Sequence, residues 1–257
     1  MKEEKLSPKT SLLPVFVLIL ILALWALVSV LHLFPESVFP SPQAVFRGFG
    51  EEMRAGRLLD DLVASIFRVT VGFALAVALG IPLGLLLGHR AHARKALLPT
   101  INFFRNLSPL AWIPFAILWF GIGDRPAIFL IFMASFFPIA LATMAAVANI
   151  PSVFFRVAEN YGYRGREFLT QVTLPAIAPQ VITALRITAG LAWVVVVAAE
   201  MIAGQDGLGF AVWDSRNGLR VDLLVVNMIV IGFIGVLIDR LLLLLTRMPS
   251  IRWGYER

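Results

Sequence analysis

The stretch LVASIFRVTVGFALAVALGIPLGLLL, residues 62–87, is apolar almost throughout and carries a single charged residue, Arg68. About 20 mainly apolar residues are enough for a helix to cross the hydrocarbon core of a bilayer. Comparable runs elsewhere predict an all-α integral membrane protein with about six transmembrane helices. The expected spans are Leu13–Leu33, Leu62–Leu87, Leu97–Phe120, Ala127–Ala148, Val181–Ala203 and Leu223–Leu245.

The composition of the chain agrees with a membrane location. Of its 257 residues 59% are hydrophobic, 15% are charged and none is cysteine. Soluble domains average about 45–50% apolar and about 25% charged residues, so an ordinary soluble enzyme or a disordered regulator is excluded. The net charge of +6 is explained by basic residues that anchor helix ends, and no nucleic-acid-binding motif is present.

The distribution of lysine and arginine predicts the orientation in the membrane. With the N-terminus inside, the cytoplasmic segments hold 12 of the 22 basic residues and the outer segments hold 6. Basic residues favour the cytoplasmic side, so we expect both termini there. The chain then divides into cytoplasmic tails at 1–12 and 246–257 and a single transmembrane domain at 13–245. Within that domain, residues 34–61 form an outer amphipathic segment and residues 149–180 a cytoplasmic loop.

Motifs of enzymes are missing from the sequence. It has no phosphate-binding G-x-x-x-x-G-K-[ST] loop, no H-E-x-x-H and no G-x-S-x-G. His89 and His92 could share a helical face and hold a metal, but their basic neighbours favour a position at the membrane surface. We predict no catalytic site, metal site or cofactor in this chain. The longest loop is too short for a further domain, so another chain must supply any energy.

Glycines recur every fourth residue at Gly80, Gly84 and Gly88. This spacing lines one face of a helix with small residues, against which a neighbouring backbone can pack closely. The stripe indicates helix packing within the chain, or alternatively a subunit interface or a moving gate.

Ionisable residues inside the expected spans also carry information. Charges within a bilayer are unfavourable unless they face a cavity or a partner. Three arginines, Arg68, Arg105 and Arg186, stand against one acid, Glu200, in the deeper positions. We expect an excess of buried positive charge, which would suit an anionic cargo.

The loop IPSVFFRVAENYGYRGREFLTQVTLP, residues 150–175, is the most distinctive segment. It predicts a polar, aromatic helix over Arg156–Phe168, broken at Gly162. Its aromatic side chains have no core of their own to enter. They indicate a short helix that docks in a groove of a cytoplasmic partner, or alternatively an aromatic belt at the membrane interface.

In this loop the sequence resembles the inner-membrane permeases of binding-protein-dependent, ATP-driven (ABC) importers. That family carries the pattern E-A-A-x3-G-x9-I-x-L-P, which places its second alanine at Ala158 and its glycine at Gly162. The isoleucine falls on Val172 and the final pair on residues 174–175. The glutamate of the pattern is replaced by Arg156, which puts in doubt any salt bridge that this acid would form.

Further segments narrow the resemblance to the branch that imports nitrate, aliphatic sulfonates, taurine and bicarbonate. They are FPSPQAV (39–45), GFALAVALGIPLGLLLG (72–88), RNLSPLAWIPFAILWFGIGD (105–124), FFPI (136–139) and AWVVVVAAEMIAGQDGLGF (192–210). The resemblance extends over nearly the whole chain.

The resemblance implies a type I ABC importer permease in a bacterial inner membrane. Its expected partners are a second permease copy, which makes a homodimer, two cytoplasmic ATPase subunits that bind ATP and Mg, and an external substrate-binding protein. The residues expected to couple this chain to the ATPase are Arg156, Ala158, Glu159, Tyr161, Gly162, Tyr163, Arg164, Glu167, Leu174 and Pro175.

The resemblance does not identify the residues of the translocation path. We therefore choose candidates from the spans that polar residues interrupt. The candidates are Arg105, Ser108, Trp112, Trp119, Glu200 and Arg68. Glu200 could instead pair with Arg68, which would make both residues structural. The alternative to an importer is a secondary transporter or channel for small anions, but such folds often contain internal repeats, and we find none. A membrane-embedded hydrolase would need a nucleophile and a base in one place, which the sequence does not provide.

Overall fold

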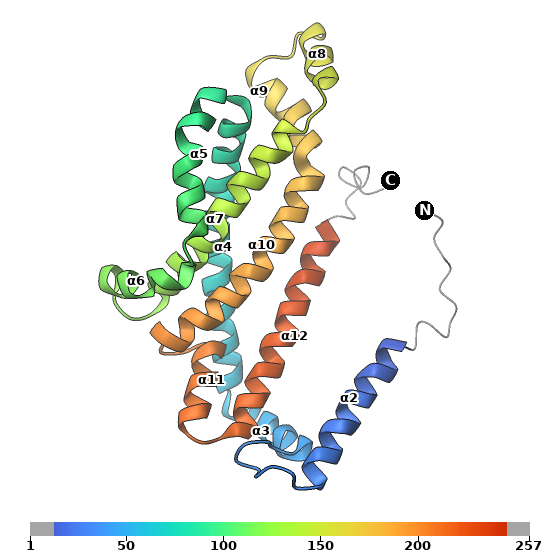
Figure 1. Cartoon of the computed structure of the whole chain (residues 1–257), viewed down its shortest axis with the longest axis vertical. Helices are drawn as coiled ribbons and strands as arrows, with labels where there is room; N and C mark the ends of the chain where they lie inside the picture. The colour runs from blue at the N-terminus through green and yellow to red at the C-terminus, as the bar shows by residue number, and fades with distance from the viewer. Residues whose placement is uncertain (1–12, 246–257) are drawn as a thin grey trace.

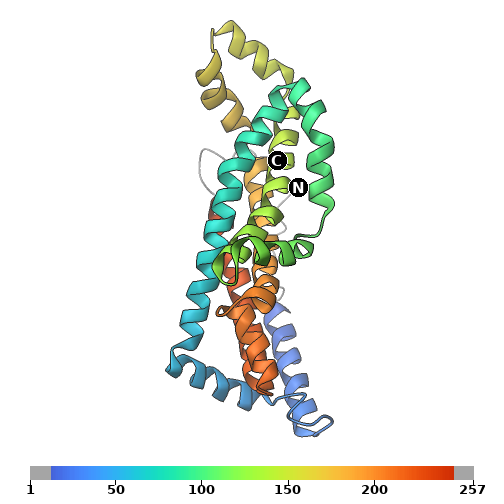
Figure 2. The same cartoon turned by 90° about the vertical axis from the view of Figure 1, so that its left-hand side faces the viewer.

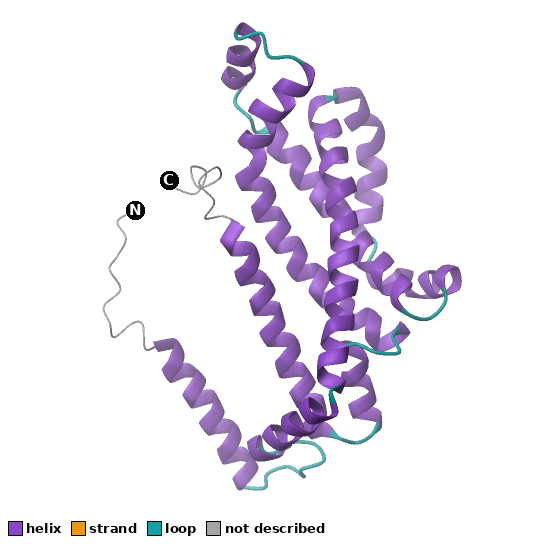
Figure 3. Ribbon diagram, turned by 180° about the vertical axis from the view of Figure 1, so that it is seen from behind, coloured by secondary structure: helices purple, strands orange, loops and turns teal. Residues whose placement is uncertain are grey.

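The computed structural model describes residues 13–245, and the two expected tails, 1–12 and 246–257, lie outside these residues. The described part consists of helices joined by turns and contains no strand (Figure 1, Figure 3). The longer helices are α2 (Leu13–Val30), α3 (Pro42–Ala55), α4 (Arg57–His89), α5 (Ala91–Asn106), α7 (Asp124–Ala148), α10 (Leu174–Ala203), α11 (Leu208–Asn217) and α12 (Val221–Leu245). The shorter ones are a 3-10 turn (Pro109–Trp112), α6 (Ile113–Phe120), α8 (Ser152–Asn160), α9 (Gly165–Glu167) and a π-helix (Phe168–Thr173).

Five helices of the described chain are long and apolar enough to cross a membrane: Leu13–Val30, Arg57–His89, Asp124–Ala148, Gly165–Ala203 and Val221–Leu244. The sixth expected span, Leu97–Phe120, is wrong as a single helix. Pro109 disfavours helical geometry in the residue before it, and Ser108 is accordingly extended at φ −58° and ψ 128°. The chain therefore leaves α5 at Asn106 and restarts as the short helix α6.

The helices form an elongated bundle with α8 at one end and α3 at the other, which we call the α8 end and the α3 end (Figure 1). Figure 2 shows α4 running along most of this length, from α3 to the turn before α5. Helix α7 packs against both α4 and α10 and is the most buried of the spans. Helix α2 leans away from the bundle, has no buried residue, and is tied to the rest by a hydrogen bond from Trp25 Nε1 to the Pro40 carbonyl, 3.0 Å long.

Helix α3 lies within the outer amphipathic segment expected over residues 34–61. Ser41 caps its start by accepting a hydrogen bond from the backbone N–H of Ala44, and Pro42 occupies the first turn, where a missing N–H is harmless. Gly56, in the left-handed region at φ 76°, ends α3 and lets α4 begin at once in a new direction. Helix α4 therefore begins at Arg57, before the start of the expected span over residues 62–87.

Small residues hold α4 against α7. The structure places Gly80, Gly84 and Gly88 on this contact and extends the stripe to Gly72 and Ala76, at the same four-residue spacing. A Cβ atom added at any of the four glycines would lie 2.5–3.1 Å from an atom of α7. The two helices can therefore approach this closely only because these positions lack side chains.

Replacing Gly84 by alanine tests this packing. The added Cβ would lie 2.5 Å from both the Ala140 carbonyl oxygen and the Thr143 Cβ, so α4 and α7 would have to separate. We expect Gly84→Ala to destabilise the protein by about 1–3 kcal/mol, as overpacking does elsewhere. The measurement is the midpoint of thermal unfolding of the purified protein in detergent.

The matched control is Gly232→Ala on α12, where an added Cβ meets no atom within 4 Å. That change should leave the midpoint unchanged or raise it slightly, because alanine favours helices more than glycine does. Equal midpoints for the two variants would contradict the close-packing account.

Candidate functional site

A buried arginine and a buried glutamate form the centre of the bundle's main polar cluster. Arg68 on α4 and Glu200 on α10 are each 1% exposed, and Arg68 Nη1 lies 2.8 Å from Glu200 Oε1. Both residues belong to membrane-spanning helices, where an unpaired charge is strongly unfavourable. The pair therefore fixes the distance between α4 and α10 at this level.

Two more carboxylates complete the surroundings of Arg68. Asp124, the first residue of α7, accepts a hydrogen bond from Arg68 Nε over 2.7 Å. Asp206, in the turn after α10, accepts from Arg68 Nη2 with its carboxylate and from Nη1 with its backbone carbonyl, the latter over 2.9 Å. One guanidinium thus joins α4 to α7, to α10 and to the turn between α10 and α11.

The start of α11 is held by side chains of the same cluster. The backbone N–H groups of residues 207–209 donate in turn to Asp61 Oδ1, Ser65 Oγ and Glu200 Oε2, over 2.8, 2.9 and 3.0 Å. The first N–H groups of a helix have no partner within it and carry partial positive charge, so two carboxylates and a hydroxyl are suitable acceptors. Gly207 has φ 100°, and a Cβ there would lie 2.5 Å from the Glu200 carboxyl carbon.

The charge of this cluster overturns the expected excess of buried positive charge. Arg68 faces three carboxylates, and the only other arginine–carboxylate pair between two membrane-spanning helices of residues 13–245 joins Arg186 to Asp239, with Nη2 and Oδ1 2.9 Å apart. The expectation is wrong because turn residues, which span periodicity does not reveal, supply the missing acids. An anionic cargo therefore gains no support from buried arginines.

The six path candidates fall into three pairs. Arg68 and Glu200 belong to the buried cluster and pair with each other, which is the structural alternative left open by the sequence. Arg105, at the end of α5, and Ser108 are exposed, and Arg105 forms no ion pair with any of residues 13–245.

The remaining two path candidates are Trp112, the last residue of the 3-10 turn, and Trp119 on α6. The rings of Trp112 and Trp119 are 6.2 Å apart, and Trp119 is 56% exposed. Leu118 beside it is 77% exposed, so α6 presents a large apolar and aromatic surface that the described chain does not cover.

Sequence analysis missed four residues of the cluster: Asp61, Ser65, Asp124 and Asp206. Ser65 could have been found, because residues 61, 65 and 68 share one face of α4 at helical spacing. Asp124 begins α7 directly after Gly123, Asp206 stands before Gly207 in a turn, and no periodic signal links either residue to Arg68.

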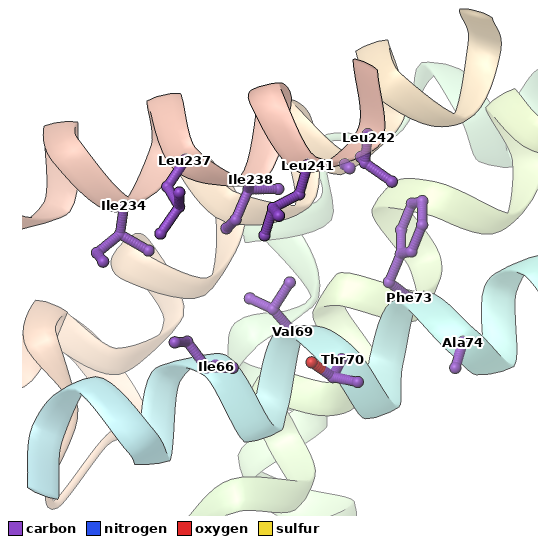
Figure 4. A pocket seen from close by; sticks show the side chains of 11 residues that line it. Ile66, Val69, Thr70, Phe73, Ala74, Ile234, Leu237, Ile238, Leu241 and Leu242 are labelled. Carbon is purple, nitrogen blue, oxygen red and sulfur yellow. The ribbon is translucent and has the colours of Figure 1, made fainter. Parts of the chain in front are cut away.

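An apolar cavity of about 390 Å³ lies between α4 and α12 (Figure 4). In that view Ile66, Val69 and Phe73 face Ile234, Ile238 and other residues of α12 across the gap. Thr70 supplies the one hydroxyl among the described residues that line it. Because an oxyanion needs several hydrogen-bond donors or a cation, this cavity is not where such a cargo would be held.

At the α8 end, the geometry explains why Ala158 and Gly162 stand four residues apart. Helix α8 ends in a Schellman motif, in which the N–H of Tyr163 donates to the Ala158 carbonyl and that of Gly162 to the Glu159 carbonyl, each over 3.0 Å. Gly162 has φ 77°, the left-handed conformation that this motif requires.

The motif turns side chains of the loop outward. Ala158 is buried at 2% exposure, whereas Tyr161, at the tip of the turn, is 78% exposed. The four charged residues expected to couple to an ATPase are also exposed: Arg156, Glu159, Arg164 and Glu167. Leu174 and Pro175 are exposed too and begin α10, directly after the π-helix. All ten expected coupling residues thus lie within one protruding segment, residues 152–175 (Figure 1).

His89 connects this protruding segment to α4. Its Nε2 lies 3.3 Å from the buried Thr173 Oγ1, its Nδ1 lies 2.9 Å from the Leu85 carbonyl oxygen, and its ring meets Phe168 edge-on. Among the described residues no group of three His, Cys, Asp or Glu side chains could hold a metal ion. Through its contacts with Phe168 and Thr173, His89 packs the two ends of the π-helix against α4.

Comparison with known proteins identifies the family. The sequence model described as "Binding-protein-dependent transport system inner membrane component" matches residues 80–248, most of the chain, including α8 and the Schellman turn. The chain belongs to this family of ABC importer permeases. Membership of a family of multi-pass inner-membrane permeases confirms the resemblance seen in the 150–175 loop.

Curated relatives confirm the branch of the permease. The taurine transport system permease protein TauC of Escherichia coli is 34% identical over 231 residues, which cover 86% of this chain and 82% of TauC. The putative aliphatic sulfonates transport permease protein SsuC of Bacillus subtilis is 30% identical over 92% of this chain and 86% of SsuC. The nitrate import permease protein NrtB of a Synechocystis strain is 34% identical over 180 residues, which cover 70% of this chain and 66% of NrtB.

A solved structure confirms the type I architecture of the permease. The MetNI methionine ABC transporter, in an inward-facing conformation, superposes with a TM-score of 0.59 and 22% sequence identity. The match covers 72% of the permease and 94% of the MetNI chain. At this identity the likeness concerns the fold alone.

Removing the charge of Arg68 tests the importance of the buried cluster in the permease. We expect Arg68→Gln to destabilise the protein by about 3–5 kcal/mol, because Glu200 would remain charged, buried and without its cation. The measurement is the yield and the thermal midpoint of the purified permease.

The matched control is Arg220→Gln. Arg220 also contacts two carboxylates, Glu51 and Asp222, but its side chain is 46% exposed, and exposed pairs contribute only about 0–1 kcal/mol. Similar losses in the two variants would show that burial does not make the Arg68 cluster special.

Proposed function

We propose that the permease imports a small oxyanion, namely nitrate, an aliphatic sulfonate, taurine or bicarbonate. An external binding protein delivers the anion, and ATP is hydrolysed, with Mg, on a separate ATPase. Relatives named for taurine, aliphatic sulfonate and nitrate transport support this range of cargo. The observation that carries the coupling part of the proposal is the protruding segment at residues 152–175, with its Schellman turn and exposed Tyr161.

A cytoplasmic ATPase would bind the α8 end. A shallow apolar groove of about 380 Å³ lies beside α8, between Phe154, Val157 and Ala158 on one side and Val172 and Pro175 on the other. Exposed charges surround it, which suits a protein partner rather than lipid. In a homodimer of the permease, two such segments would engage two ATPase subunits.

The positive-inside distribution supports this orientation. It places the α8 end and both termini in the cytoplasm of a bacterial inner membrane, and the α3 end outside, towards the binding protein. The translocation path would then run between two permease copies. The exposed α5–α6 region, with Arg105, Ser108, Trp112 and Trp119, would line this path, and the Arg68–Glu200 cluster would support its wall.

Co-purification and ATPase assays test the proposal. The tagged permease would be isolated from membranes that contain the products of its neighbouring genes, and ATP hydrolysis would be measured in lipid. We expect an ATPase subunit to co-purify, and its activity to rise when binding protein loaded with one of nitrate, bicarbonate, taurine or an alkanesulfonate is added. If no ATPase co-purifies and the permease alone moves anions in liposomes, it is a channel or secondary transporter instead.

Gly162→Ala tests the docking segment. A left-handed conformation is about 1–2 kcal/mol less favourable for alanine than for glycine, so the Schellman turn should be populated about 5- to 30-fold less. We expect ATPase binding and coupled transport to fall by that order while the bundle stays folded, as measured by pull-down and thermal midpoint. The control, Gly50→Ala on α3, has open space around it and should bind the ATPase normally.

Arg105→Ala tests the translocation path. Arg105 is exposed and is not needed for any ion pair within the described chain, so the permease should assemble normally with its ATPase. Anion uptake should drop about tenfold, the effect of losing about 1.4 kcal/mol of attraction for the cargo. Arg105→Lys, which keeps the charge, should retain most of the uptake. Loss of assembly in Arg105→Ala would instead assign the residue a structural role.

A further inference from the structure

We propose that Asp124 and Asp206 form a releasable latch on Arg68, which closes the outer side of the transport path and opens during each cycle. The inference rests on the proposed function, because it needs an ATP-driven change between two conformations. In the closed latch, the two aspartates hold α7 and the end of α10 in position relative to each other.

The partners of Arg68 differ in burial. The Glu200 side chain is 0% exposed and also accepts hydrogen bonds from Ser65 Oγ and from the backbone N–H of Gly209. The side chains of Asp124 and Asp206 are 50% and 59% exposed. A half-exposed carboxylate that leaves Arg68 is hydrated at once, whereas a separated Glu200 would be stranded in the protein interior. The Arg68–Glu200 pair is therefore permanent, and the contacts with the two aspartates can be released.

The turn before Asp124 has room to reorient, whereas the backbone around Asp206 is held in place. Asp124 follows Gly121 and Gly123, which have φ 78° and 127° and open space around their Cβ positions. Hinges are commonly a few such residues at the ends of elements. The N–H groups of residues 207–209, which follow Asp206, are bonded to Asp61, Ser65 and Glu200, so release of Asp206 needs only a rotation of its side chain.

The latch and the protruding segment lie at opposite ends of the same two helices, α7 and α10. Helix α7 ends at Ala148, directly before α8, and α10 begins directly after the π-helix, so the segment that docks the ATPase joins these two helices at the α8 end. Asp124 begins α7 and Asp206 follows the end of α10, so Arg68 ties the same two helices together at their opposite ends (Figure 1). A displacement of the segment by the ATPase would strain this tie.

Release would also be favoured by charge. Asp124 and Asp206 both bond to one guanidinium whose single charge is already paired with Glu200, so their negative charges repel each other. Separation of α7 from the α10–α11 turn lowers that repulsion, while the bonds to Arg68 oppose it. The latch requires that these opposing contributions leave two conformations of similar free energy, which an ATP-driven partner can then interconvert.

A distance measurement tests the latch. The permease has no cysteine, so Arg125→Cys and Gln205→Cys, both exposed, allow one spin label on each side of the latch. In the complete complex with its ATPase, we expect the distance within one copy to lengthen by about 5 Å, on the order of one helical turn, between the nucleotide-free and the ATP-trapped states. Singly labelled variants identify the distances between copies.

An unchanged distance in a complex that binds and hydrolyses ATP would overturn the latch and leave the proposed function intact. Failure of any ATPase to bind the permease would overturn the proposed function and the latch with it.

Charge-removing variants give a second readout. Asp124→Asn and Asp206→Asn weaken the closed state, so we expect ATPase activity without binding protein to rise about two- to fivefold, the range given by one exposed ion pair. Asp214→Asn, an exposed carboxylate 3.6 Å from Arg57, is the control and should leave that activity unchanged. If both latch variants only lower the thermal midpoint and leave the basal rate unchanged, the aspartates are structural and the proposal is wrong.

Discussion

A guanidinium on a membrane-spanning helix must find a carboxylate, and in this permease the pairing of Arg68 with Glu200 sets the arrangement of the bundle. The pair fixes α4 against α10, and the remaining bonds of Arg68 reach α7 and the α10–α11 turn. The same carboxylate of Glu200 accepts an N–H at the start of α11. Removal of one partner would leave the other charge buried, and this penalty holds the four elements together more strongly than the attraction itself does.

The glycine stripe on α4 acts over the rest of that helix. It brings α4 into close contact with α7 from Gly72 to Gly88, on the α8 side of Arg68 and Asp124. Helix α7 leads directly into the protruding segment, and α10 leads out of it. The permease thus links its proposed ATPase-binding end to its charged cluster through two continuous helices, and His89 adds a contact between the segment and α4.

Much of this architecture could be predicted from sequence, because apolar runs and four-residue glycine spacing are local signals. The spans, the outer amphipathic helix and the family pattern of the 150–175 loop are all of this kind. The break at Ser108–Pro109 was underestimated, since an apolar run alone does not show where the backbone turns. The three acids around Arg68 come from α10, from the first residue of α7 and from the turn after α10, and only the packed fold brings them together. For that reason the sequence suggested excess positive charge where the structure has excess negative charge.

The central claim is that this chain moves an anion only when a separate ATPase drives it through the protruding segment. The most direct measurement is the uptake of a labelled anion by liposomes that contain the permease alone, or the permease with its ATPase, external binding protein and ATP. The account predicts uptake against a concentration gradient only in the complete system, and none with a non-hydrolysable ATP analogue. Anion flux through the permease alone, at a rate comparable with that of the complete system, would contradict it.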